Sequence, residues 1–166
     1  MHLILDADGL IKLHRSGVLA HTVSAFRCTI PRAVYEEVVV RGKAKLHQDA
    51  ERIERILDGA VAVESVEGRR RRDAGLGAGE LAILGLLSKK PQAITVSDDR
   101  RFLAILTAQD APFLTPADII VVLARRSILK PEEAQAALER LKPAIRAAAY
   151  WEARHALESG GKGHEE

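Results

Sequence analysis

The sequence Leu3-Ile4-Leu5-Asp6-Ala7-Asp8-Gly9-Leu10, residues 3–10, is a short apolar strand that runs directly into two acids and then into a helix. A strand end with two acids is unsuited to a hydrophobic core, because burying unpaired carboxylates is costly. It is typical of the carboxyl edge of a parallel sheet, where α/β folds place their sites. The pattern recurs once, because an apolar strand ending at Ser97 is followed by Asp98 and Asp99. Two strand ends with acids predict a site for a hard divalent cation, which prefers carboxylate oxygens.

The composition sets broad limits on the kind of protein. The chain has 166 residues, of which 47% are hydrophobic, which is enough to bury the core of one domain. A single cysteine, Cys28, excludes an internal disulfide and a multi-cysteine zinc site. We see no signal peptide and no apolar run as long as a membrane span, so we expect a cytoplasmic protein with no membrane association.

Short apolar strands alternate with amphipathic helices along most of the chain. We expect strands at residues 3–5, 26–30, 60–66, 93–96 and 112–114. We expect helices at residues 9–19, 31–42, 46–59, 80–87 and 101–109, and another that begins at a capping box formed by Thr115 and Asp118. This alternation predicts an α/β fold with a parallel sheet and helices on both faces.

The chain after residue 129 has no strand signal. We therefore expect a sheet-containing domain at residues 1–129, a helical appendage at 130–158 and a disordered, Gly-rich tail at 159–166. Leu138, Leu141, Ile145 and Trp151 lie at roughly helical spacing in the appendage. Such helices either cover the domain's own core or contact a second chain, and we favour a homodimer.

The acids at the strand and helix ends differ in how well a structural role explains them. Capping the next helix would explain Asp8, but it explains Asp6 poorly, so Asp6 is the stronger metal-ligand candidate. Glu80 precedes an apolar helix whose buried N-terminus should point at the sheet edge. One of Asp98 and Asp99 can be a helix cap, but a structural role for both is the less favoured interpretation.

Two further groups of charged residues are less specific. Glu36 and Glu37 are adjacent on a helix and point about 100° apart, so at most one of them faces the site. The basic residues that could hold a phosphate backbone are Arg69, Arg70, Arg71 and Arg72 before Glu80, and Arg100 and Arg101 after the second acidic strand end. A solvated linker is the competing interpretation of the four-arginine run.

Four stretches together resemble the PIN-domain nucleases, in particular the small prokaryotic VapC-like toxin ribonucleases. They are LILDADGLIKL at 3–13, IPRAVYEEVVVRG at 30–42, GAGELAIL at 77–84 and TVSDDRRFL at 95–103. The resemblance implies a three-layer α/β/α fold around a short parallel sheet. It also implies a cluster of acids that binds Mg²⁺ or Mn²⁺, cleavage of single-stranded RNA, and a cognate antitoxin protein as partner.

By position, the resemblance implies a set of catalytic acids: Asp6, Glu37 (with Glu36 as the fallback), Glu80 and Asp99, with Asp98 still open. Asp6, Asp8, Glu80, Asp98 and Asp99 are the implied metal ligands. The family usually has Ser or Thr where Asp8 stands, so this chain adds a negative charge to the site.

Two other functions compete with a nuclease. Asp6 and Asp8 also resemble the first motif of haloacid-dehalogenase-type phosphatases, in which they would be nucleophile and acid/base, with Asp98 and Asp99 as the late metal pair. Leu10 departs from that motif, and no Ser/Thr or Lys motif of that family follows. The other alternative is a PIN-like protein that binds RNA or a partner without cutting.

Overall fold

The computed structural model describes residues 1–66 and 75–160. The strands are β1 (His2–Leu5), β2 (Arg27–Pro31), β3 (Ala62–Glu64), β4 (Ile94–Val96) and β5 (Phe113–Leu114). The helices are α1 (Ala7–Arg15), α2 (Leu19–Ala25), α3 (Arg32–Tyr35), α4 (Arg41–Ala44), α5 (Gln48–Leu57), α6 (Ala78–Lys89), α7 (Arg100–Ala108), α8 (Pro116–Arg125), α9 (Pro131–Leu141) and α10 (Ala147–Gly160). A π-helical segment, Glu36–Val40, joins α3 to α4, and a 3₁₀ turn, Lys142–Ala144, follows α9.

The five strands form one parallel sheet in the order β3-β2-β1-β4-β5. The first strand of the chain is therefore the central one, with β2 on one side and β4 on the other. Leu5 pairs with Val96 in the register of β1 and β4, so the residues that follow these two strands emerge side by side. The parallel α/β class expected from the sequence is confirmed.

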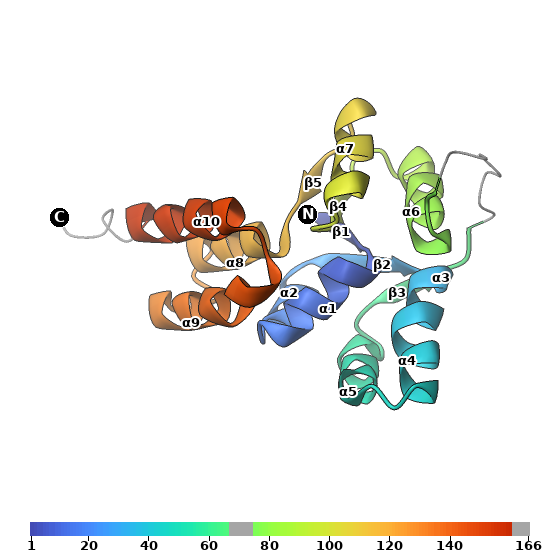
Figure 1. Ribbon diagram of the computed structural model, residues 1–166, viewed down its shortest axis with the longest axis horizontal. Coiled ribbons are helices and arrows are strands. Elements are labelled where there is room, and N and C mark those ends of the chain that lie inside the picture. The colour runs from blue at the N-terminus through green and yellow to red at the C-terminus, as the bar shows by residue number, and fades with distance from the viewer. Residues whose placement is uncertain (67–74, 161–166) are drawn as a thin grey trace.

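Side chains of β1 alternate between the two faces of the sheet, as a strand with a period of two residues requires. Leu3 and Leu5 belong to the larger core, which includes α1, α2, α5 and α8. Ile4 belongs to a smaller core built from α6 and α7. Figure 1 shows α6 and α7 above the strands and α1 and α2 below them, which makes three layers.

The C-terminal helices belong to the larger core. Figure 1 shows α8, α9 and α10 together at one end of the molecule, and Leu138, Leu141 and Tyr150 are almost fully buried there. Trp151, which the helical spacing placed with the apolar residues, is 56% exposed, and its neighbour Tyr150 fills the core instead. Because these helices complete the core of the sheet domain, the boundary at residue 129 is not a break in packing.

Two details differ from the expected elements. The first predicted helix is two helices, because Gly17, with φ +82°, ends α1 before α2 begins. Helix α10 continues through Ser159 and Gly160, which we had assigned to a disordered tail; residues 161–166 lie outside the described part. Within the residues that the structure describes, no helix has the length and apolarity that crossing a membrane requires.

Helix α1 starts in very close contact with the end of β4. A Cβ atom on Gly9 would lie 2.4 Å from the carbonyl oxygen of Val96 and 2.9 Å from Oδ1 of Asp6. No side chain fits there without displacing backbone. Glycine at this position is therefore required by close packing, and its φ is not in the left-handed region.

We expect Gly9→Ala to destabilise the fold by about 2 kcal/mol, because overpacking against backbone cannot be relieved by a side-chain rotation. The free energy of unfolding, measured by urea denaturation, gives this value directly. Gly160→Ala is the matched control, since no atom lies within 4 Å of the added Cβ. Equal stability of the two variants would show that the backbone at Gly9 relaxes freely.

Candidate metal site

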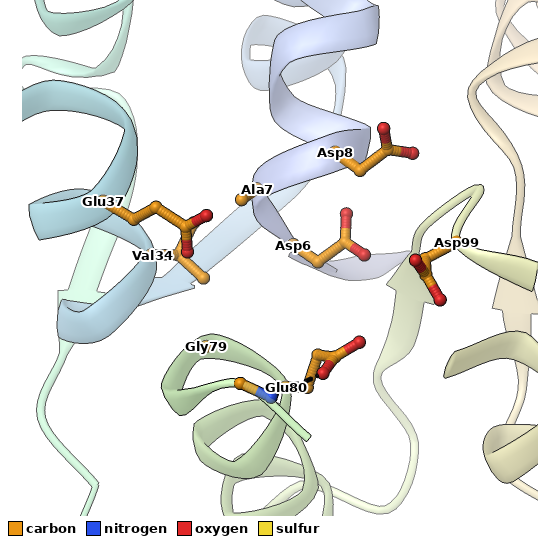
Figure 2. A pocket seen from close by; sticks show the side chains of 9 residues that line it. Asp6, Ala7, Asp8, Val34, Glu37, Gly79, Glu80 and Asp99 are labelled. Carbon is orange, nitrogen blue, oxygen red and sulfur yellow. Dashed lines mark hydrogen bonds between the residues drawn. The ribbon is translucent and has the colours of Figure 1, made fainter. Parts of the chain in front are cut away.

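A cavity of ≈ 220 Å³ opens at the carboxyl edge of the sheet. Five acids line it: Asp6, Asp8, Glu37, Glu80 and Asp99. Figure 2 shows that they come from different elements and lie around the same space, with Glu37 and Asp99 on opposite sides and Glu80 below Asp6. The sequence analysis named all five as candidates, and the fold brings them to one cavity.

Asp6 lies at the base of this arrangement, directly after β1. It is 5% exposed, and it is the N-cap of α1. Its Oδ1 accepts a 2.6 Å hydrogen bond from the N–H of Gly9, and its own N–H donates to the carbonyl of Val96. These contacts hold the carboxylate rigidly between the two central strands.

The environment of Asp6 opposes its ionisation. Burial is the main reason that the pKa of Asp6 is raised to about 7, and the negative charges of Asp8 and Asp99 act in the same direction. Hydrogen bonds from Ser97 and Gly9 act in the opposite direction but do not cancel the effect of burial. An acid in this condition is stabilised by any cation that enters the cavity.

Glu37 reaches the cavity from the π-helical segment. Val34, one helical turn earlier, also lines the cavity, whereas Glu36 lines a separate depression with Arg32 and Ser65. A Cβ on Gly79 would lie 3.1 Å from Val34 and 3.8 Å from the Glu37 carboxylate, so this glycine lets α6 approach the segment. Of the two adjacent glutamates, the structure therefore directs Glu37 to the site.

Glu80 and Asp99 each bind the start of their own helix as well as lining the cavity. An oxygen of Glu80 accepts a 2.7 Å hydrogen bond from the N–H of Gly77, the N-cap of α6. Asp99 is the N-cap of α7 and accepts a 2.8 Å hydrogen bond from the N–H of Phe102. Each of these acids therefore binds the start of its own helix and also lines the cavity.

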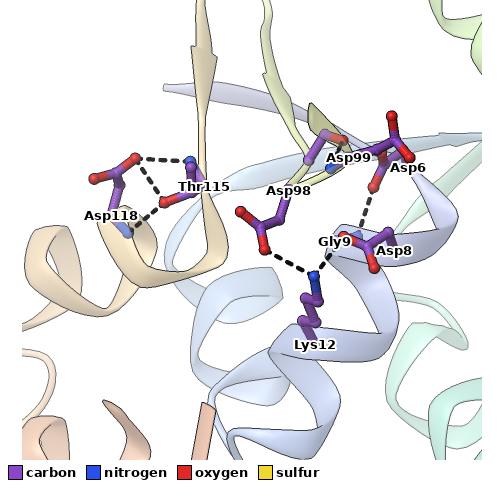
Figure 3. A network of polar contacts seen from close by, with 9 residues as sticks. Asp6, Asp8, Gly9, Lys12, Asp98, Asp99, Thr115 and Asp118 are labelled. Atoms are coloured by element: carbon purple, nitrogen blue, oxygen red, sulfur yellow. Dashed lines mark hydrogen bonds and ion pairs between the residues drawn. The ribbon is translucent and has the colours of Figure 1, made fainter. Parts of the chain in front are cut away.

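Asp98 is placed differently from Asp99. Its side chain is 3% exposed and forms a 2.7 Å ion pair with the ammonium group of Lys12. Lys12 also pairs with Asp8 at 3.0 Å, one turn earlier on α1. Figure 3 shows Asp98 turned towards Lys12, and it does not line the cavity. Of the two predicted acids after β4, only Asp99 faces the cavity.

Lys12 is the residue of this site that the sequence analysis did not identify. Burial lowers its pKa, but the hydrogen bonds to Asp98 and Asp8 outweigh burial, so the net shift is upward and the ammonium stays charged. One signal was available in the sequence, because Asp8 and Lys12 are four residues apart on a helix, the spacing of a side-chain ion pair. The contact with Asp98 is 86 residues away along the chain and had no sequence signal.

The predicted basic residues are only partly described. Arg69, Arg70, Arg71 and Arg72 lie outside the described residues. Arg100 and Arg101 are exposed at the start of α7, directly after Asp99, and Arg101 lies against Gly75. Their role in binding nucleic acid stays a prediction.

The donors of the cavity fit a hard divalent cation, because all the charged groups that line it are carboxylates. As the side chains stand, no three His, Cys, Asp or Glu residues among those described are grouped closely enough to hold an ion. The donors of the cavity are therefore of the type that Mg²⁺ and Mn²⁺ prefer, and a cation beside the buried Asp6 would favour its ionised form.

We expect Asp6→Asn to stabilise the metal-free protein more at pH 8 than at pH 5. Because the folded-state pKa of Asp6 is raised, the stability from its proton is present below about pH 4 and is lost as the pH rises through about 7. Unfolding by urea in EDTA should show a gain for the variant on the order of a few kcal/mol at pH 8. Asp58→Asn, at an exposed aspartate, is the control. Parallel stability curves for wild type and Asp6→Asn would contradict the expected burial effect.

Comparison with known proteins identifies the family to which the chain belongs. A search of curated proteins finds no relative that matches the chain. A protein-family model described as PIN domain matches residues 2–154, which include all five strands, the acid-lined cavity and most of the C-terminal helices. This match covers nearly the whole chain, and we conclude that the chain belongs to the PIN domain family.

Proposed function

We propose that this protein is a metal-dependent endoribonuclease that cleaves single-stranded RNA. The observation that supports the proposal most directly is the convergence of five acids from separate elements on one cavity at the carboxyl edge of the sheet. Membership of a family whose members are typically nucleases supports the same interpretation.

In this proposal the acids of the cavity would bind the metal ion, and the neighbouring arginines would contact the RNA. Asp6, Glu37, Glu80 and Asp99 would hold the cation, with Asp8 at the rim. When bound, Mg²⁺ or Mn²⁺ would supply an activated water and offset charge on the scissile phosphate. Asp6 would be the fixed reference point, since its hydrogen bond to Gly9 and its burial leave it little freedom. Arg100 and Arg101 would contact the phosphate backbone near Asp99.

The family assignment favours a nuclease over the phosphatase alternative. In a phosphatase Asp8 would need to exchange protons with the substrate, whereas here it is ion-paired with Lys12. The two activities are separated by one experiment, which compares Mn²⁺-dependent cleavage of single-stranded RNA with hydrolysis of a small phosphate ester. If the protein catalysed neither reaction, the result would indicate a PIN-like protein that binds RNA or a partner without cutting.

The proposal extends to the biological role and to the partners of the protein. A toxin role with a cognate antitoxin protein follows from the resemblance to VapC-like proteins, and a homodimer remains our expectation for the assembly. The exposed Trp151, flanked by Arg154 and Lys142, is one surface on the C-terminal helices that such contacts could use.

We expect Glu37→Gln to lower the rate of RNA cleavage by about 100-fold or more, because a lost metal ligand removes several kcal/mol of transition-state stabilisation. The adjacent Glu36→Gln is a matched control, since Glu36 is on the same helix but outside the cavity. The measurement is single-turnover cleavage of a labelled single-stranded RNA in Mn²⁺, with EDTA as the blank. Equal losses in both variants would remove Glu37 from the site, and cleavage that persists in EDTA would overturn the metal dependence.

A further inference from the structure

Lys12 places a permanent positive charge inside the acidic cluster. Its ammonium nitrogen lies 2.7 Å from Oδ2 of Asp98 and 3.0 Å from Oδ2 of Asp8. The lysine side chain is 14% exposed, and the Asp98 side chain is 3% exposed. Figure 3 shows the ammonium between the two carboxylates, beside the first turn of α1.

A divalent ion that bound Oδ2 of both Asp8 and Asp98 would need the position that the Lys12 ammonium group occupies. Such an ion lies about 2.1 Å from each carboxylate oxygen that it binds. The ammonium already lies within hydrogen-bond distance of both oxygens, so the ion and the ammonium would overlap and repel each other. Lys12 therefore blocks the space between these two oxygens of Asp8 and Asp98.

The remaining acids are not blocked in this way. Asp6, Glu80 and Asp99 each accept a hydrogen bond from a main-chain N–H group, and Asp6 accepts another from Ser97, so each carboxylate keeps further lone pairs. In two-metal sites the ions lie about 3.5–4 Å apart and share carboxylates. A second ion that used Asp8 and Asp98 would therefore have to displace the ammonium group of Lys12.

We propose that Lys12 is a tethered cation that replaces a second metal ion, so that the site binds a single divalent ion and Asp98 is not a ligand. This inference rests on the proposed function, because it assumes that the cavity binds metal. It assigns Lys12 a positioning role, in which it also ties the end of β4 to α1. Removing the lysine would free Oδ2 of Asp98 beside its buried Oδ1, which has no hydrogen-bond partner among the described residues, so that Asp98 could then bind an ion.

The test counts ions. Titration of the full chain with Mn²⁺, followed by calorimetry and by the electron paramagnetic resonance signal of free Mn²⁺, should give one ion per wild-type chain. Lys12→Met keeps the apolar stem but removes the charge, and it should bind two. Lys12→Arg keeps the charge and should bind one. Arg15 lies three residues after Lys12 on α1 and pairs with Asp49 at the surface. Arg15→Met removes this exposed cation, and the variant should still bind one Mn²⁺ ion.

The outcomes separate this inference from the function on which it rests. Two ions in the wild type, or one ion in Lys12→Met, would overturn the inference and leave a metal-dependent nuclease intact. No Mn²⁺ binding at millimolar concentration would overturn the metal-dependent function and the inference with it.

A second comparison keeps the inference testable if Lys12→Met does not fold. Asp99→Asn should weaken Mn²⁺ binding by at least about tenfold, as expected for loss of a ligand, whereas Asp98→Asn should leave the affinity within about twofold. Equal losses in the two variants would show that Asp98 is a ligand and would overturn the role given to Lys12.

Discussion

The contact between the first turn of α1 and the end of β4 is the constraint on which the site depends. The Val96 carbonyl leaves room only for glycine at position 9, and it also accepts the N–H of Asp6. Because β1 lies between β2 and β4, this contact fixes where α1 begins relative to the central strands. The direction of Asp6, and through it the centre of the cavity, follows from that single point of packing.

The N-terminal ends of three helices stabilise the acids that are gathered in the cavity. Asp6, Glu80 and Asp99 each bind an N–H in the first turn of a helix or at its N-cap, in α1, α6 and α7 respectively. A helix start has a partial positive charge and free N–H donors, so it stabilises a carboxylate beside it. These bonds offset part of the repulsion between the acids before any cation is present, and the buried Asp6 is the acid for which the compensation is incomplete.

The sequence predicted the sheet well because its strands are short apolar runs with clear ends. The acids after β1 and β4 were correctly located at one edge, since parallel strands must end on the same side. The choice between Asp98 and Asp99 could not be made from sequence, because it depends on Lys12, 86 residues earlier. The sequence pattern also predicted Trp151 in the core, whereas Tyr150 is the buried residue. The 3₁₀ turn at Lys142–Ala144 interrupts the helical spacing counted from Leu141, and the sequence pattern did not reveal that turn.

The π-helical segment Glu36–Val40 has an evolutionary consequence. A π-turn is an α-helix with one extra residue, which is costly and is found mostly at functional sites. Deleting one residue there would restore a regular helix and rotate every side chain on one side of the deletion by about 100° relative to the other. Val38 and Val39, which are buried, would then lose their register with Val34 and Glu37. Homologous chains should therefore tolerate substitutions in this segment far better than changes in its length.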